Sequence, residues 1–186
     1  MRLVDLTDEE LALRARAEPQ AAFEVLFGRY QQPLYNFLLR QGSPPGRVDD
    51  LFQTTFLKAF RAVSSFREEA RFRSWLYAIA VNVLADDRRA AHRRGPEAEV
   101  PETLPAPEPP LHETAEGAEI LARVREALDE LQPNHRLLFV LVRFQGLSIA
   151  EAAEVVEMSP PAAKVTLFRA QKRVGERLAS VREKIS

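Results

Sequence analysis

The sequence predicts an all-α protein built as two small helical domains joined by an acidic, proline-rich linker. The 186 residues contain no sustained two-residue alternation rich in Val, Ile and Thr, which is the pattern of a strand. Bulky apolar residues instead recur at three- and four-residue steps on both sides of a proline-rich stretch. We therefore expect a helical domain at 1–94, a flexible linker at 95–117 and a second helical domain at 118–186.

The N-terminal domain is expected to begin with a short helix and to continue with a long one. Thr7 and Glu10 fit a capping box that starts the short helix. Pro33 is expected to kink or break the long helix, because proline lacks a backbone donor. The apolar stripe of the long helix consists of Phe23, Leu26, Phe27, Tyr30, Leu34 and Phe37.

Two more apolar stripes complete this domain, after a loop at 42–46 that is rich in glycine and proline. Both stripes have helical spacing, so their residues are expected to face a shared core. The stripe of the second helix is Phe52, Phe56, Phe60 and Val63, and that of the third is Phe72, Trp75, Leu76, Ile79 and Val83.

Proline and acidic residues mark the linker. Six of the thirteen prolines stand between residues 96 and 110, and residues 96–119 carry seven acidic and no basic residues. The flanking segments carry 15 basic against 12 acidic residues and 11 against 8. The net charge of −1 therefore hides two mildly basic ends around an acidic middle that resists packing.

The C-terminal domain is expected to contain four helices. The first ends at Gln132-Pro133, and Asn134 is predicted to cap the second, which stops at Gly146. Ser148 and Glu151 then fit a capping box that starts the third helix. The last two helices together have the pattern of a helix-turn-helix, which offers its second helix to the DNA major groove.

The last helix has an inward stripe of small and apolar residues, namely Ala163, Leu167, Ala170 and Val174. At about 100° per residue, another set is expected to point the other way, namely Ala162, Val165, Thr166, Arg169, Lys172 and Arg173. Cations on that face suit phosphates and base edges. The alternative is that they only keep an amphipathic helix soluble.

Enzymatic, metal-binding and membrane functions have little support. The chain has no cysteine and three scattered histidines, and it lacks a phosphate-binding glycine loop and a nucleophile with its base. We therefore expect no catalytic residues, metal or cofactor. Neither a signal peptide nor a run of eighteen apolar residues is present, so a soluble, cytoplasmic protein without membrane insertion is expected.

Two blocks in the N-terminal domain, 49–60 and 66–82, resemble the most characteristic segment of bacterial sigma factors of the extracytoplasmic-function (ECF) type. The resemblance continues through the linker, Leu131-Gln132-Pro133 and the helix-turn-helix that begins at 146, with matching order and spacing. It implies a factor that binds core RNA polymerase and directs promoter-specific initiation. It also implies two partners on the polymerase, the clamp helices of the largest subunit and the flap of the second-largest.

The resemblance assigns roles to three groups of residues. Polymerase binding falls to Asp50, Gln53, Thr54 and Leu57. Opening of the minus-10 promoter element falls to Ser65, Arg67, Asn82, Asp86, Arg89 and Arg93. Recognition of the minus-35 element falls to Lys164, Val165, Thr166, Arg169, Lys172 and Arg173. An anti-sigma factor that restrains the protein is a further implied partner.

The recognition helix departs from the family pattern. The family usually has Gly-Thr-Val-Lys-Ser-Arg where this chain has residues 161–166, so Thr166 replaces a commonly basic residue. Altered minus-35 specificity and weakened binding are both compatible with this change. An alternative function is a sigma-like adaptor or decoy that binds polymerase or an anti-sigma factor without reading the minus-35 element. A helix-turn-helix regulator that does not dock on polymerase would leave the block at 49–82 unexplained.

Overall fold

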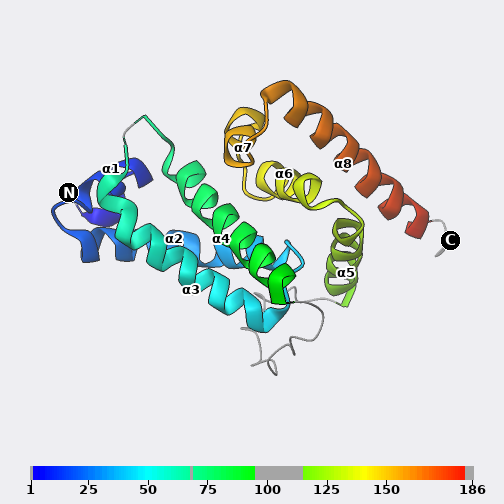
Figure 1. The fold of residues 1–186 in the computed structure, drawn as a ribbon, viewed down its shortest axis with the longest axis horizontal. Helices are drawn as coiled ribbons and strands as arrows, with labels where there is room; N and C mark the ends of the chain where they lie inside the picture. The colour runs from blue at the N-terminus through cyan, green and yellow to red at the C-terminus, as the bar shows by residue number, and fades with distance from the viewer. Residues whose placement is uncertain (1, 68, 95–114, 183–186) are drawn as a thin grey trace.

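The computed structural model describes residues 2–94, except 68, and 115–182, and these residues form eight α-helices and two short 3-10 helices with no strand. The expected all-α class is therefore confirmed (Figure 1). Most of the expected linker lies outside the described residues, although its last three positions already belong to a helix. The elements are η1 (Leu3–Asp5), α1 (Asp8–Arg14), α2 (Pro19–Leu39), α3 (Pro45–Ala62), η2 (Val63–Ser65), α4 (Phe72–Arg94), α5 (Ala115–Asp129), α6 (Pro133–Arg143), α7 (Ile149–Val155) and α8 (Pro160–Arg182).

Helices α1 to α4 form the N-terminal domain around an aromatic core. The predicted capping box of Thr7 and Glu10 starts α1: the Thr7 N–H donates to Glu10 Oε2 at 2.7 Å, and the Glu10 N–H donates to Thr7 Oγ1 at 3.2 Å. The rings of Phe23, Phe56 and Phe72 are buried. They meet neighbouring rings mostly edge-on, the arrangement that aromatic quadrupoles favour.

The predicted break at Pro33 is wrong, because α2 continues through it to Leu39. Pro33 and the two residues before it are exposed, so water can reach the carbonyl that loses its intrahelical donor. Beside this exposed strip, Tyr30, Leu34 and Phe37 are buried and hold both halves of the helix against the core. Tertiary packing here outweighs the local cost of the proline.

The predicted inward stripe of α3 is partly wrong. Phe56 and Val63 are buried, but Phe60 keeps 38% of its surface exposed while its ring packs edge-on against Phe23 at 5.1 Å. Phe27 of α2, whose ring contacts Phe52 and Phe56 of α3, is 36% exposed. The α2–α3 pair therefore leaves aromatic surface at its outer edge.

Helices α5 to α8 form the C-terminal domain, and α8 packs against the other three. The predicted cap at Asn134 is wrong: the cap position is Gln132, whose side chain makes no capping bond, and Pro133 is the first helical residue. Proline suits that position because the missing donor would have no partner there. The predicted capping box of Ser148 and Glu151 is confirmed at the start of α7.

The turn of the helix-turn-helix is closed by a glutamate in a left-handed conformation. Glu157 has φ 56°, and its N–H donates to the Glu154 carbonyl at 3.2 Å. The N–H of Met158 donates to the Ala153 carbonyl at 2.8 Å. These two bonds form a Schellman motif, in which the left-handed position is usually glycine because it has no Cβ.

The two domains pack against each other through helices α4 and α7, with further contacts from the end of α2 and the segment after α6 (Figure 1). The Tyr77 hydroxyl donates to Gln145 Oε1 at 2.5 Å in a buried contact, and the Arg40 guanidinium lies 4.5 Å from the centre of the Phe144 ring. Gly42 has φ 79°, and a Cβ at this residue would lie 2.3 Å from Arg136 Nη1. Any other residue here would strain the backbone and would require the Arg136 guanidinium to shift.

Candidate polymerase and nucleic-acid interfaces

The first candidate surface is the outer face of α3. Asp50, Gln53, Thr54 and Leu57 are all exposed, and they come from successive turns of one helix. Leu57 has 55% of its surface exposed, which is unusual for a large apolar side chain. The face thus combines polar groups with an apolar residue that a partner could cover.

An ion-pair network runs from the first turn of α3 to α4. Arg47 donates from Nε to Asp87 Oδ1 at 2.7 Å and from Nη1 to Asp50 Oδ2 at 3.3 Å. The bond to Asp87 is the main reason that the pKa of Arg47 rises above its ordinary value. The carboxylate of Asp50 is 67% exposed and keeps a side open to a partner.

The second candidate surface is the face of α4 that carries Asn82, Asp86, Arg89 and Arg93. All four side chains are exposed, as their three- and four-residue spacing predicts. The domain contact made by Tyr77 uses the opposite side of α4, because at about 100° per residue it lies roughly half a turn from Asn82. Domain packing therefore leaves this basic face accessible.

Asp86 is already engaged by two cations. Its carboxylate accepts from Arg89 Nη2 at 2.6 Å and from Lys58 Nζ at 3.3 Å. These two hydrogen bonds, first that of Arg89 and then that of Lys58, hold the pKa of Asp86 below its ordinary value. Asp86 therefore orients Arg89 and links α4 to α3.

Ser65 and Arg67 lie on either side of Phe66 in the segment that leads from η2 to α4, and both are exposed. The Ser65 hydroxyl donates to the Ala62 carbonyl at 2.7 Å. Phe66 itself is buried and contacts the rings of Phe72 and Trp75 at 5.9 and 5.6 Å. Phe66 is therefore a core residue of the N-terminal domain.

The third candidate surface is the exposed face of α8. Lys164, Val165, Arg169 and Lys172 are exposed, and Val165 shows 50% of its surface. Among the described residues, Lys164 and Arg169 have no ion-pair partner, whereas Lys172 lies 3.9 Å from Glu176 in a loose pair. Phe168 is 66% exposed next to Arg169 and adds apolar surface to the face.

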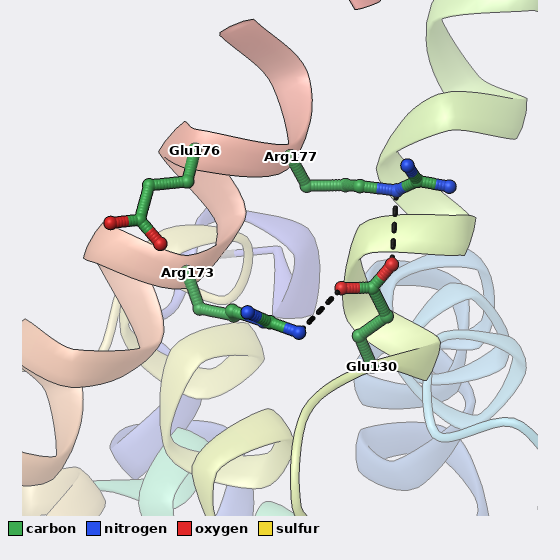
Figure 2. A pocket seen from close by; sticks show the side chains of 4 residues that line it. All are labelled: Glu130, Arg173, Glu176 and Arg177. Carbon is green, nitrogen blue, oxygen red and sulfur yellow. Dashed lines mark ion pairs between the residues drawn. The ribbon is translucent and has the colours of Figure 1, made fainter. Parts of the chain in front are cut away.

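Of the other two expected members of this face, Thr166 is buried, whereas Arg173 is exposed but paired. The predicted outward orientation of Thr166 is wrong, since it is 8% exposed at the edge of the buried stripe. Arg173 leans toward α5, where Glu130 Oε2 lies 3.2 Å from its Nη2 (Figure 2). Glu130 also pairs with Arg177 at 3.0 Å and so joins α5 to α8. The buried arc of α8 is wider than its apolar stripe because α5, α6 and α7 all pack against it.

Sequence reasoning missed several residues around these surfaces. Phe27 and Phe60 extend the apolar edge next to Leu57, and Lys58 connects the first two surfaces. Their sequence signal was ambiguous, because an aromatic residue at helical spacing is normally assigned to the core. Tyr77 and Gln145 left no local signal, since they lie 68 residues apart.

Neither a metal site nor a membrane span is evident in the part of the chain that the structure describes. These residues contain no group of three or more histidine or acidic side chains placed to hold a metal ion. Their helices include none with the length and apolar character needed to cross a membrane.

Comparison with known proteins matches both domains to regions of the same family of transcription factors. Residues 26–94 match the family Sigma-70 region 2, and residues 121–174 match the family Sigma-70, region 4. The ECF RNA polymerase sigma-E factor of Escherichia coli (strain K12) is 31% identical, and the alignment covers 93% of this chain and 95% of that protein.

Two solved structures share the fold. CnrH, solved in complex with the cytosolic domain of CnrY, is 28% identical with a TM-score of 0.70, over 93% of this chain and 97% of that one. The sigma factor RpoE of Bartonella quintana, solved with the anti-sigma factor NepR, is 23% identical with a TM-score of 0.71, over 84% and 96%. The ranges matched by the two families contain all three candidate surfaces.

Proposed function

The chain belongs to the extracytoplasmic-function sigma factors of the sigma-70 family, and on that premise we propose how its two domains divide the work of promoter-specific initiation. As a sigma factor it binds core RNA polymerase and directs transcription from promoters, and it is not an enzyme. The domain at 1–94 docks on polymerase and opens the minus-10 element. The domain at 118–186 reads the minus-35 element, and 95–117 connects them.

Polymerase docking is assigned to Asp50, Gln53, Thr54 and Leu57 of α3. The exposed carboxylate and amide can pair with arginines of a partner, while burial of Leu57 would supply apolar area. Phe60 extends the same apolar edge and joins the proposed contact. The clamp helices of the largest subunit are the proposed partner surface. Contact with the flap of the second-largest subunit is assigned to the C-terminal domain.

Opening of the minus-10 element is assigned to the exposed face of α4 and the segment before it. Asn82 can hydrogen-bond an unpaired base, and Arg89 and Arg93 can hold the backbone of the separated strand. Ser65 and Arg67 provide the second side of this surface. Asp86 contributes by orienting Arg89.

Recognition of the minus-35 element is assigned to Lys164, Val165, Arg169 and Lys172 of α8. The arginine and lysines suit guanine edges and phosphates, and Val165 suits a thymine methyl group. Because Thr166 is buried and Arg173 pairs with Glu130, neither is retained as a base contact. The unpaired, exposed Arg169 is the observation that favours DNA reading over the adaptor alternative.

Two further proposals concern location and regulation. Since the chain acts with RNA polymerase, we place it in the cytoplasm. Two structural neighbours are complexes, one with the cytosolic domain of CnrY and one with an anti-sigma factor. We propose an anti-sigma factor as a regulatory partner of this chain too.

In vitro transcription with core polymerase from the host tests the proposed function. We expect the chain to direct initiation at a defined set of start sites on host DNA. Core polymerase without the chain should not use these sites. A folded chain that binds core polymerase yet yields no specific transcript would contradict the proposal and favour the adaptor.

A further inference from the structure

Two residues of the N-terminal segment hold the backbone at both ends of the segment between η2 and α4. Arg16, which follows α1, donates from Nη2 to the carbonyl of Phe66 at 2.7 Å. Glu9, inside α1, accepts from the backbone N–H of Phe72 at 3.2 Å. Helix α1 packs against both η2 and α4, so these bonds belong to a continuous contact (Figure 1).

Both bonds give a partner to a backbone group that has none within a helix. The N–H of Phe72 is the first of the 23-residue helix α4 and has no acceptor within that helix. A carboxylate at this point also suits the positive end of the helix dipole. The Phe66 carbonyl receives a charge-assisted bond from a guanidinium, which is stronger than a bond from a neutral donor.

Helix α1, which contains Glu9 and precedes Arg16, is itself held in place. Asp8 accepts from Arg29 Nη1 at 2.6 Å and from the hydroxyl of Tyr30 at 2.5 Å, both on α2. Arg29 donates further to the carbonyls of Val4 and Leu6 at 2.8 and 2.9 Å. Because these bonds fix α1 on α2, α1 can hold the segment between η2 and α4 in a fixed position.

The anchored segment carries part of the surface assigned to the minus-10 element. Ser65 and Arg67 flank Phe66, whose carbonyl Arg16 holds and whose ring is fixed between Phe72 and Trp75. Capture of an unpaired base needs donors and walls that keep their geometry when the base enters. A shift of the Phe66 carbonyl would move both flanking side chains.

We infer that Glu9 and Arg16 are positioning residues for minus-10 recognition: they hold the backbone in place at Phe72 and at Phe66 without touching DNA. This inference rests on the proposed function, because it concerns the surface assigned there to the minus-10 strand. It adds α1, which that assignment does not use, to the machinery of promoter opening.

Arg16→Gln and Glu9→Gln test the inference in the full chain bound to core polymerase. Arg14→Gln is the matched control: it removes the same charge two residues away, and among the described residues Arg14 pairs with Glu18 on the surface, at 2.9 Å. The measurement is binding of single-stranded oligonucleotides that carry the minus-10 sequence of a mapped promoter, compared with single-base variants of that sequence. Opening of the duplex promoter is followed by permanganate reactivity.

We expect Arg16→Gln to reduce discrimination between the correct and the altered base by roughly tenfold, since displacements of about 1 Å have effects of this order or larger. Opening of the duplex should fall with it, while Arg14→Gln matches wild type. Binding of duplex minus-35 DNA should be unchanged in all variants. Arg16→Lys, which keeps a cationic donor, should restore part of the discrimination.

The inference is overturned if Arg16→Gln and Glu9→Gln both distinguish the correct from the altered base, and open the promoter duplex, as well as wild type does. A loss of thermal stability in Arg16→Gln does not obscure the test, because the ratio of affinities for two oligonucleotides is measured on the folded fraction alone. Arg16→Lys and Glu9→Gln provide a second reading of that ratio. Absence of any base preference in the wild-type complex would instead contradict the proposed function.

Discussion

Tyr77 of α4 donates its phenolic hydrogen to Oε1 of Gln145, 2.5 Å away, and both side chains are buried between the two domains. Arg73 adds a bond from Nη1 to the Gln145 carbonyl at 3.3 Å. These contacts lie on the side of α4 away from Asn82. The closed arrangement of the domains therefore leaves the surface assigned to the minus-10 strand open, as a promoter reader requires.

Tyr77→Phe is expected to weaken the contact between the domains. The substitution leaves the Gln145 amide oxygen without its donor in a buried site, at a cost of about 1–3 kcal/mol. A double-mutant cycle with Gln145→Ala measures the coupling, and we expect about 1 kcal/mol between the two side chains. If the two substitutions change the free energy of unfolding by strictly additive amounts, the bond contributes nothing to stability.

The three tyrosines are expected to resist ionisation while the protein is folded. Burial, chiefly, raises the pKa of Tyr30 and of Tyr77 well above the ordinary range, and it raises the pKa of Tyr35 to about 12. The neutral form is thus favoured in the folded state, so this contribution to stability is present below the unfolded pKa of about 10 and is lost as pH rises past it.

Ultraviolet absorbance of tyrosinate during an alkaline titration checks this expectation. The signal should stay flat through about pH 10, the ordinary tyrosine pKa, and should then rise together with loss of helical circular dichroism. Ionisation of one or more tyrosines near pH 10 in a fully helical protein would contradict the burial described for them.

Glu157→Gly is expected to stabilise the C-terminal domain. An L-residue in the left-handed region costs about 1–2 kcal/mol, and glycine removes that cost but adds about 0.4–1 kcal/mol of unfolded-state entropy. The net gain should be roughly 0.5–1 kcal/mol, a rise of about 2 °C in the melting temperature. Glu154→Gly, the same change inside α7, is the control and should lower stability by about 1 kcal/mol.

Arg169→Ala is expected to weaken minus-35 binding without affecting association with core polymerase. Loss of one base contact costs about 1–3 kcal/mol, so affinity in a gel-shift assay should fall roughly tenfold or more. Arg173→Ala removes the same charge one turn further along α8, where the guanidinium pairs with Glu130. The effect of Arg173→Ala on DNA binding should be clearly smaller. Equal losses of affinity in the two variants would contradict the assignment of the exposed face of α8 to the minus-35 element.

Leu57→Ala is expected to weaken binding to core polymerase while the fold stays intact. Because Leu57 is 55% exposed in the unbound chain, its truncation leaves no cavity. If a partner covers it, the loss should be about 1–2 kcal/mol in a pull-down or titration. Arg61→Ala, an exposed change one turn along α3, serves as control. Unchanged binding of Leu57→Ala would remove this residue from the docking surface.

Most of the fold could be predicted from local patterns. Apolar stripes located the helices, and the capping boxes of Thr7 and Ser148 marked two of their starts, because these signals act within one or two turns. Pro33 misled the prediction because packing of distant residues such as Phe37 decides whether a proline ends a helix. Local sequence carries no information about that packing.

The candidate site was less accessible from sequence for a related reason. Periodicity gives the direction of a buried face but not its width, so Thr166 was placed outside although it is buried in a helix against which α5, α6 and α7 all pack. Long-range polar contacts such as Arg16 to Phe66 and Tyr77 to Gln145 join residues 50 and 68 positions apart. Only the folded chain brings them together.

Footprinting of the reconstituted holoenzyme on a mapped promoter tests the central claim most directly, namely that one chain reads two promoter elements with two domains. We predict protection of the minus-35 duplex that disappears with Arg169→Ala, together with unpaired bases at the minus-10 element that persist in that variant. Specific transcription without minus-35 protection, or simultaneous loss of both signals in Arg169→Ala, would contradict the division of labour between the two domains.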